Sequence, residues 1–155
     1  MKNKEITIRY VQKGEAKAIT NLKMRSKASN GYSPEFMDAC RDELSVSEGD
    51  FETLEIWVAE RDHAIVGMLD IRFEDARCIL EALFIDPEIK SAGIGRLMFE
   101  KCEQRCREAG ASLIEVDSDP EAQAFYEKMG MIKTGEIPSG SIAGRFLPRL
   151  EKHLR

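Results

Sequence analysis

The chain has 155 residues, a length that suits one core, so we expect a single domain over residues 1–155. It is 43% hydrophobic and carries a formal net charge of -5, which argues against a nucleic-acid binder because such proteins rely on basic patches. No apolar run is long enough to cross a bilayer, and residues 1–8 are too polar for a signal peptide. We therefore expect a globular cytoplasmic protein that binds neither nucleic acid nor membrane.

The first half of the chain predicts a strand, two helices and three further strands. Thr7–Val11 is a short strand, and Glu15–Ala28 carries an apolar stripe at helical spacing. A serine and a proline at 33–34 suit the start of a helix that runs to Leu44, and the polar segment Ser45–Thr53 follows as a loop. The next strands are joined by short turns, which indicates an antiparallel meander, and they are expected at Leu54–Glu60, Ala64–Phe73 and Arg77–Asp86.

The second half alternates helices and strands. A proline at 148 would place the last strand at a sheet edge or a bulge. This order predicts an α/β fold, with a mixed, mostly antiparallel central sheet and helices on both faces. The expected elements are a helix at Ile94–Ala109, a strand at Leu113–Asp117, a helix at Asp119–Met129, and strands at Met131–Gly135 and Arg145–Leu154.

The cysteines do not form a recognisable metal or redox motif. None of the four makes a Cys-x-x-Cys pair, and neither histidine stands at ligand spacing from them. Cys102 and Cys106 are four residues apart on an expected helix, so both should share its buried face. Free cysteine packs as a small apolar side chain, and we therefore expect reduced, buried thiols and no bound metal.

Small residues fill the turn between the third meander strand and the long helix, which reads Ile85-Asp86-Pro87-Glu88-Ile89-Lys90-Ser91-Ala92-Gly93-Ile94-Gly95-Arg96. Such residues let a backbone approach a ligand closely, and the first helical turn offers free N–H groups to a pyrophosphate. Lys90 and Arg96 add positive charge nearby. A Walker A loop is excluded because Arg96 follows Gly95, and a dinucleotide fingerprint because Met98 occupies its third small position. A plain tight turn is the alternative.

Two motifs resemble those of the GNAT superfamily of N-acetyltransferases. Leu83-Phe84-Ile85-Asp86-Pro87 followed by the loop 90–95 resembles the acetyl-CoA signature Arg/Gln-x-x-Gly-x-Gly/Ala, which follows a strand ending in Leu-x-Val-x-Pro, with lysine first here. The segment 119–131 resembles Asn-x-x-Ala-x-x-Phe-Tyr-x-x-x-Gly-Phe, with Asp119 at the asparagine and Met131 at the last phenylalanine. The resemblance covers Leu54–Gly135 well.

The resemblance implies how acetyl-CoA would bind. The fourth strand would splay from the fifth, and the pantetheine arm would fill the gap beside the backbone of Leu83–Ile85. The loop would hold the pyrophosphate through its N–H groups. The residues expected to contact acetyl-CoA are Leu83, Phe84, Ile85, Lys90, Ser91, Ala92, Gly93, Ile94, Gly95, Arg96, Asp119 and Phe125.

Acetyl transfer to an amine needs a proton acceptor for the amine and a proton donor for the leaving thiolate. The resemblance makes Tyr126 the general acid, although an apolar stripe around it also fits a core tyrosine. Glu81 lies in an apolar run, where burial would help a carboxylate accept a proton, so it is the candidate base. The alternative is a solvated, inert glutamate at the mouth of the strand gap. Glu115 is a weaker candidate.

The function expected from the resemblance is N-acetyl transfer from acetyl-CoA to a primary amine of a small molecule or peptide. Gly31–Leu44 and Pro138–Arg145 should form the acceptor pocket, because these segments resemble the family least and carry many polar groups. A non-catalytic acetyl-CoA-binding sensor or scaffold is the alternative function. We also expect a homodimer, because the last strand would leave an edge open for pairing.

Overall fold

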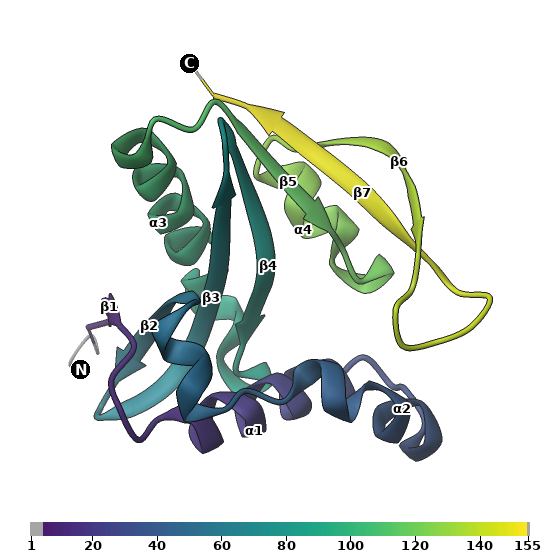
Figure 1. The fold of residues 1–155 in the computed structure, drawn as a ribbon. Helices are drawn as coiled ribbons and strands as arrows, with labels where there is room; N and C mark the ends of the chain where they lie inside the picture. The colour runs from purple at the N-terminus through teal and green to yellow at the C-terminus, as the bar shows by residue number, and fades with distance from the viewer. Residues whose placement is uncertain (1–4, 155) are drawn as a thin grey trace.

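Within the described part of the chain, seven strands form one sheet in the order β1-β2-β3-β4-β5-β7-β6 (Figure 1). The computed structural model of the chain describes residues 5–154, apart from the side chains of residues 90–92. All neighbouring strands are antiparallel except β4 and β5. The strands are β1 (Thr7–Tyr10), β2 (Glu55–Arg61), β3 (Ala64–Glu74), β4 (Arg77–Ile85), β5 (Leu113–Asp117), β6 (Ile132–Pro138) and β7 (Phe146–His153).

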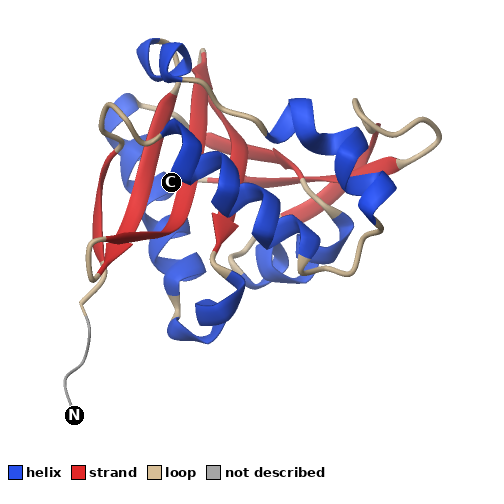
Figure 2. Cartoon of the chain, turned by 90° about the horizontal axis from the view of Figure 1, so that it is seen from below, coloured by secondary structure: helices blue, strands red, loops and turns tan. Residues whose placement is uncertain are grey.

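Helices cover both faces of this sheet (Figure 2), which confirms the expected α/β layout. On one face, Ile19 and Leu22 of α1 pack into a cluster with Met68 of β3. On the other face, the buried side of α3 and Tyr126 of α4 build the larger cluster. The helices are α1 (Ala16–Ala28), α2 (Pro34–Leu44), α3 (Ile94–Ala109) and α4 (Gln123–Lys128), with 3₁₀ turns η1 (Glu48–Glu52), η2 (Pro87–Ala92) and η3 (Pro120–Ala122).

Local sequence signals account for several boundaries. Ser33 caps α2 by accepting a hydrogen bond from the N–H of Phe36 at 3.1 Å. Asp62 and His63 both have positive φ, as a two-residue hairpin turn between β2 and β3 requires. Gly110 ends α3 in the left-handed conformation, as expected. Among the described residues, no helix is both long and apolar enough to span a bilayer.

Two expected elements differ from the structure. The loop expected at Ser45–Thr53 contains the turn η1, which Ser47 and Asp50 cap reciprocally. The helix expected at Asp119–Met129 is divided into η3 and α4. The division follows from a tight turn at its start, where the Asp119 carboxylate accepts from the N–H of Glu121 and the Asp119 carbonyl from the N–H of Ala122.

The prediction that the last strand lies at an edge is wrong, because β7 lies between β5 and β6. Pro148 is tolerated there because β5 ends at Asp117, which pairs with Arg149. The Pro148 carbonyl accepts a hydrogen bond from the N–H of Ser118 just beyond that end. The missing N–H of the proline therefore costs the sheet no hydrogen bond between strands. The true edge on this side of the sheet is β6.

The fourth strand pairs with the fifth over only part of its length. Arg77–Leu80 align with Leu113–Val116, and residues 81–85 continue without a partner on that side. Across from β3, Asp70 pairs with Ala82 and Ile71 with Leu80, so Glu81 is the extra residue of a β-bulge. β4 and β5 therefore diverge toward α1 (Figure 1), as the expected splay requires.

Candidate active site

A cavity of about 580 Å³ opens where β4 and β5 diverge. The unpaired half of β4 forms one wall and the end of β5 with α4 forms the other. The start of α3 lies at one side, while α1, α2 and the loop between β6 and β7 enclose the rest. The splay thus brings together segments that are far apart in sequence.

Most of the residues predicted to contact acetyl-CoA line this cavity. Ile94 does not, because its side chain is fully buried in the core beneath α3. The side chains of Lys90, Ser91 and Ala92 lie outside the described part of the chain. The predicted residues that line the cavity are Glu81, Leu83, Phe84, Ile85, Gly93, Gly95, Arg96, Asp119, Phe125 and Tyr126.

The first turn of α3 is shaped for a close backbone approach. Gly93 precedes the helix in the left-handed conformation, with φ of +76°, and supplies no side-chain cap. At Gly95, an added Cβ would lie 2.9 Å from Cε1 of Phe125, closer than side-chain atoms pack. The leading N–H groups of a helix have no partner within the helix, so this turn can donate to an anionic group in the cavity.

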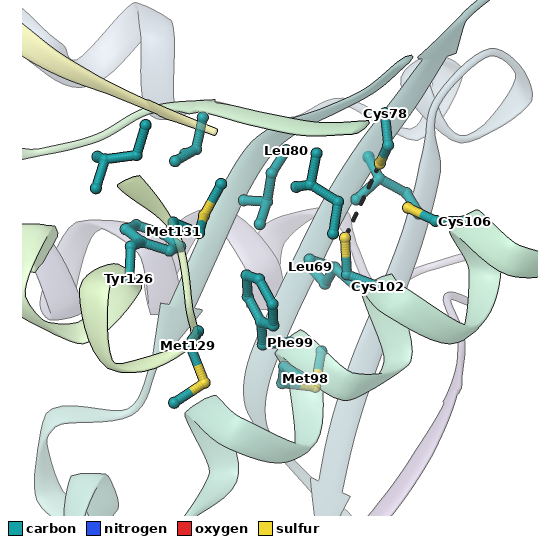
Figure 3. Packing of buried hydrophobic residues seen from close by; sticks show 14 of the residues in the cluster. Leu69, Cys78, Leu80, Met98, Phe99, Cys102, Cys106, Tyr126, Met129 and Met131 are labelled. Carbon is teal, nitrogen blue, oxygen red and sulfur yellow. Dashed lines mark hydrogen bonds between the residues drawn. The ribbon is translucent and has the colours of Figure 1, made fainter. Parts of the chain in front are cut away.

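Tyr126 lies at the boundary between the core and the cavity. The residue is only 4% exposed, and its ring packs near Phe99 and Phe125, with Met131 beside it (Figure 3). Its hydroxyl makes no hydrogen bond to any described residue. Among those residues, only Asp70 has a side-chain nitrogen or oxygen that is both fully enclosed and without a hydrogen-bond partner. The Tyr126 hydroxyl also lacks a partner, so it is not fully enclosed, and it reaches the cavity that Tyr126 lines. Burial raises the pKa of Tyr126 above its ordinary range and keeps the phenol protonated.

The two candidate bases are placed differently from each other. The Glu81 side chain is 41% exposed and accepts from Nη2 of Arg72 at 3.4 Å, so the apolar surroundings expected for it are not found. The bulge explains this, because it turns Glu81 out of the core and to the cavity mouth. Glu115 is mostly buried but does not line the cavity; it forms ion pairs with Arg77 and Arg149 instead.

A polar network that the sequence did not predict closes one end of the cavity. The carboxylate of Asp119 accepts hydrogen bonds from Lys27 Nζ at 2.8 Å and from the Tyr32 hydroxyl at 2.7 Å. Arg145 Nη2 donates to the Tyr32 hydroxyl at 2.9 Å and lies 3.5 Å from Asp119. Burial alone would raise the pKa of Asp119, but hydrogen bonds from Lys27, the Glu121 N–H and Tyr32 lower it, so the carboxylate stays charged.

This network joins the two segments predicted to form the acceptor pocket. The Arg145 guanidinium lies 4.9 Å from the ring centroid of Phe36, and the Phe36 and Tyr32 rings stack at 4.1 Å. Cys40 of α2 and Ser141 of the β6–β7 loop line the same cavity. Both segments therefore reach the site, as expected. The polar residue types pointed to these segments. The contacts themselves had no local pattern in the sequence, because they join positions more than 80 residues apart.

Lys23 and Asp70, two buried ionisable side chains that form no ion pair with each other, lie in this region. Lys23 of α1 is 6% exposed and lines the cavity next to Phe84, and Asp70 of β3 is 7% exposed and close enough for its charge to act on Lys23. Burial raises the pKa of Asp70 to about 6. The sequence carries a signal for both residues, because each is a charged side chain among apolar neighbours.

Comparison with known proteins identifies the family. A sequence profile of the acetyltransferase (GNAT) domain matches residues 15–139, most of the chain. The uncharacterised protein YxbD of Bacillus subtilis is 38% identical over 72 residues. Human N-acetyltransferase 8 and the peptidyl-lysine N-acetyltransferase YjaB of Escherichia coli are each 33% identical, over 89 and 82 residues. The matches cover 44%, 52% and 52% of this chain, and 44%, 39% and 51% of those proteins, about half their length or less.

Solved structures share the fold at low sequence identity. PaiA N-acetyltransferase of Thermoplasma acidophilum, in complex with coenzyme A, aligns with a TM-score of 0.81 and 17% identity, covering 96% of this chain and 99% of that one. A GCN5-related N-acetyltransferase of Rhodopseudomonas palustris gives a TM-score of 0.80 and 18% identity, covering 96% and 95%. The chain belongs to the GNAT family of acetyltransferases.

Proposed function

We propose that this protein transfers the acetyl group of acetyl-CoA to a primary amine of a small molecule or peptide. The observation that carries the proposal is a single cavity that reaches both the first turn of α3 and the Tyr126 hydroxyl. The pyrophosphate would bind at the first turn of α3, and the reacting sulfur would lie near the Tyr126 hydroxyl. The relative from T. acidophilum binds coenzyme A, which supports this reading of the cavity.

The residues present suit acetyl-CoA as a substrate. Along residues 81–85, β4 has no strand partner on the cavity side, so backbone groups there can pair with the amide groups of pantetheine. Gly93 leaves open space that a side chain would fill, and Gly95 allows Phe125 to pack against the start of α3. Asp119 stands where the family motif has asparagine. Since its carboxylate is already engaged by Lys27 and Tyr32, we assign it to holding the cavity wall.

Tyr126 is the general acid in this proposal. As the bond between the acetyl carbon and the sulfur breaks, the phenol gives its proton to the sulfur. Because burial raises the pKa of Tyr126, a free phenolate would be costly. The proton should therefore move only as the thiolate forms, and the proton that the amine loses must then return to the phenol. The same burial keeps Tyr126 protonated at neutral pH before the reaction.

Carboxylates at the cavity favour a cationic acceptor. Glu43, Glu81 and Glu121 line it, and Glu81 can take a proton from the incoming ammonium directly or through water. The relative YjaB is named a peptidyl-lysine N-acetyltransferase, so peptide amines belong among the acceptors to be tried. Cytoplasmic location remains part of the proposal.

A panel assay tests the function. Release of CoA thiol should be measured with polyamines, aminoglycosides, small amine metabolites and lysine-containing peptides. We expect steady turnover with at least one class of amine. In the control without an added amine, release of CoA thiol should stop once any initial phase has ended. A melting shift with acetyl-CoA but no turnover with any amine would instead favour the sensor or scaffold.

A further inference from the structure

Lys23 points its amine into the proposed acetyl-transfer cavity. The residue is 6% exposed, on the face of α1 that packs against the sheet. Its Nζ lies 5.8 Å from the ring centroid of Phe84, on the half of β4 where the thioester would lie. The amine is thus held next to the proposed reaction centre by the helix that carries it.

This amine has no polar partner within the described part of the chain. Nζ makes neither a hydrogen bond nor an ion pair there, and it lies over the face of the Phe84 ring. It is also not fully enclosed, because Asp70 Oδ1 is the sole enclosed polar side-chain atom without a partner among those residues. A side chain that is nine-tenths buried therefore keeps its nitrogen partly exposed, on a residue that lines the cavity.

Burial lowers the pKa of Lys23, since taking an ammonium out of water is costly. Carboxylates on every neighbouring element oppose this effect: Asp70 on β3, Glu43 on α2, Asp50 on η1 and Glu81 on β4. Burial outweighs them. A neutral amine has the lone pair that attack on a thioester requires.

Lys27, one helical turn further along α1, supplies the contrast. It lines the same cavity, but its Nζ donates to Asp119 at 2.8 Å. An ammonium held in such an ion pair has no free lone pair and is fixed in place. Two lysines of one helix therefore face one cavity, and only one of them is prepared to react.

We propose that Lys23 is itself an acetyl acceptor, so that the protein acetylates its own Lys23 from acetyl-CoA. This inference rests on the proposed function. The Lys23 Nζ forms a bond to the acetyl carbon, the carbon–sulfur bond breaks, and the proton lost by the amine ends on the sulfur of the released CoA thiol. The product is a neutral amide over Phe84 in the acceptor region, and its added bulk should slow turnover of free amines.

The test uses the full chain incubated with acetyl-CoA and no amine, followed by peptide mapping with mass spectrometry over time. Lys23 should gain one acetyl group on the order of tenfold faster, or more, than Lys17 or Lys27, because the cavity holds the donor next to it. Lys17 is the matched control, since it is an exposed lysine on the same helix. Lys23→Arg should abolish the fast phase, and Lys17→Arg should leave it unchanged.

A second donor separates enzymatic from chemical acetylation. Acetyl phosphate lacks the CoA portion, so it should label exposed lysines without favouring Lys23. Equal preference for Lys23 with both donors would overturn the inference. Asp70→Asn removes a charge that supports the ammonium, so labelling of Lys23 should begin at a lower pH in that variant.

The outcomes distinguish this inference from the function on which it rests. A melting shift with acetyl-CoA and turnover of an added amine, with no fast label on Lys23, would overturn the self-acetylation alone. The absence of melting shift, turnover and label together would overturn both. Because site mapping is done on the unaltered protein, the result does not depend on whether Lys23→Arg folds.

Discussion

Two buried residues, Tyr126 and Asp70, hold their protons more tightly than they would in water, for the same reason. Each is more than nine-tenths buried, and burial penalises the charged form. The consequences differ because the Tyr126 hydroxyl reaches the cavity, whereas Asp70 Oδ1 is enclosed and unpaired. One proton can be used in chemistry, and the other affects mainly the stability of the fold.

Removal of the Tyr126 hydroxyl tests the acid. Tyr126→Phe keeps the ring and its packing, and the hydroxyl has no hydrogen-bond partner among the described residues, so the free energy of unfolding should change by about 1 kcal/mol or less. Acetyl-CoA affinity should stay near normal, and turnover should fall about one hundredfold or more. Melting, binding and rate are measured on the same preparation. Near-normal turnover would show that Tyr126 is a core residue and not the acid.

The raised pKa of Asp70 predicts a pH-dependent stability. Its pKa rises from 3.8 to about 6 on folding, so its protonated form favours the folded state below pH 4 and that contribution is lost as pH rises through 6. Asp70→Asn mimics the protonated carboxyl and should raise the melting temperature at pH 8. The gain should vanish near pH 4. An equal gain at both pH values would contradict the burial of a titrating carboxylate.

At the scale of elements, the start of α3 is the proposed binding site for the pyrophosphate of acetyl-CoA. Acetyl-CoA should raise the melting temperature, since ligands of the folded state stabilise it. Gly95→Leu should abolish this shift, because even a Cβ at that position would contact Phe125 at 2.9 Å. Gly135→Leu is the control: Gly135 lies on β6 with open space around it. An unchanged shift in Gly95→Leu would show that the cofactor binds elsewhere.

α3 and β4 also enclose three thiols, which Figure 3 shows in one group. Cys78, Cys102 and Cys106 are fully buried, as predicted for the latter two, and their sulfur atoms lie within 4.8 Å of one another. Hydrogen bonds within the group raise the pKa of Cys102 and lower the pKa of Cys106 to about 4, so the sulfur atoms are engaged with one another. They also pack in the apolar core, and we expect treatment with EDTA to leave melting and turnover intact. Loss of activity that zinc restores would refute this prediction.

The elements that the sequence predicted well are those set by nearby residues. Gly93 and Gly110 bracket α3 at its expected bounds, and Ser33 begins α2. The motif residues were found because the turn before α3 is a continuous stretch of chain. Glu81 was misplaced because a bulge reverses the facing of β4, and alternation of residues alone does not reveal a bulge. Contacts such as Lys27 with Asp119 depend on the folded chain and have no local pattern.

At the scale of the molecule, the sheet ends in an open edge at β6, where Ile132 is 70% exposed. Edge strands invite pairing with another chain, so we still expect a homodimer, now through β6 and not β7. Light scattering at rising protein concentration should show the dimer mass. Thr134→Pro blocks backbone pairing at the edge, so it should shift the measured mass toward that of the monomer. A monomer mass at every concentration of the unaltered chain would refute the prediction.

Because β4 pairs with β5 over only part of its length, the sheet consists of two parts, one ending at β4 and the other beginning at β5. At one end, the two parts are joined by strand pairing of the four β4 residues Arg77–Leu80 with β5. At the other end, the Asp119 carboxylate after β5 joins the two parts through side-chain contacts with Lys27 of α1 and with Tyr32. Hydrogen bonds of the backbone resist salt, whereas ion pairs that reach water are screened by it. The side chains of Lys27 and Asp119 are only 13% and 17% exposed, so salt should screen their contact weakly, and the two parts of the sheet should stay joined at both ends over a wide range of ionic strength.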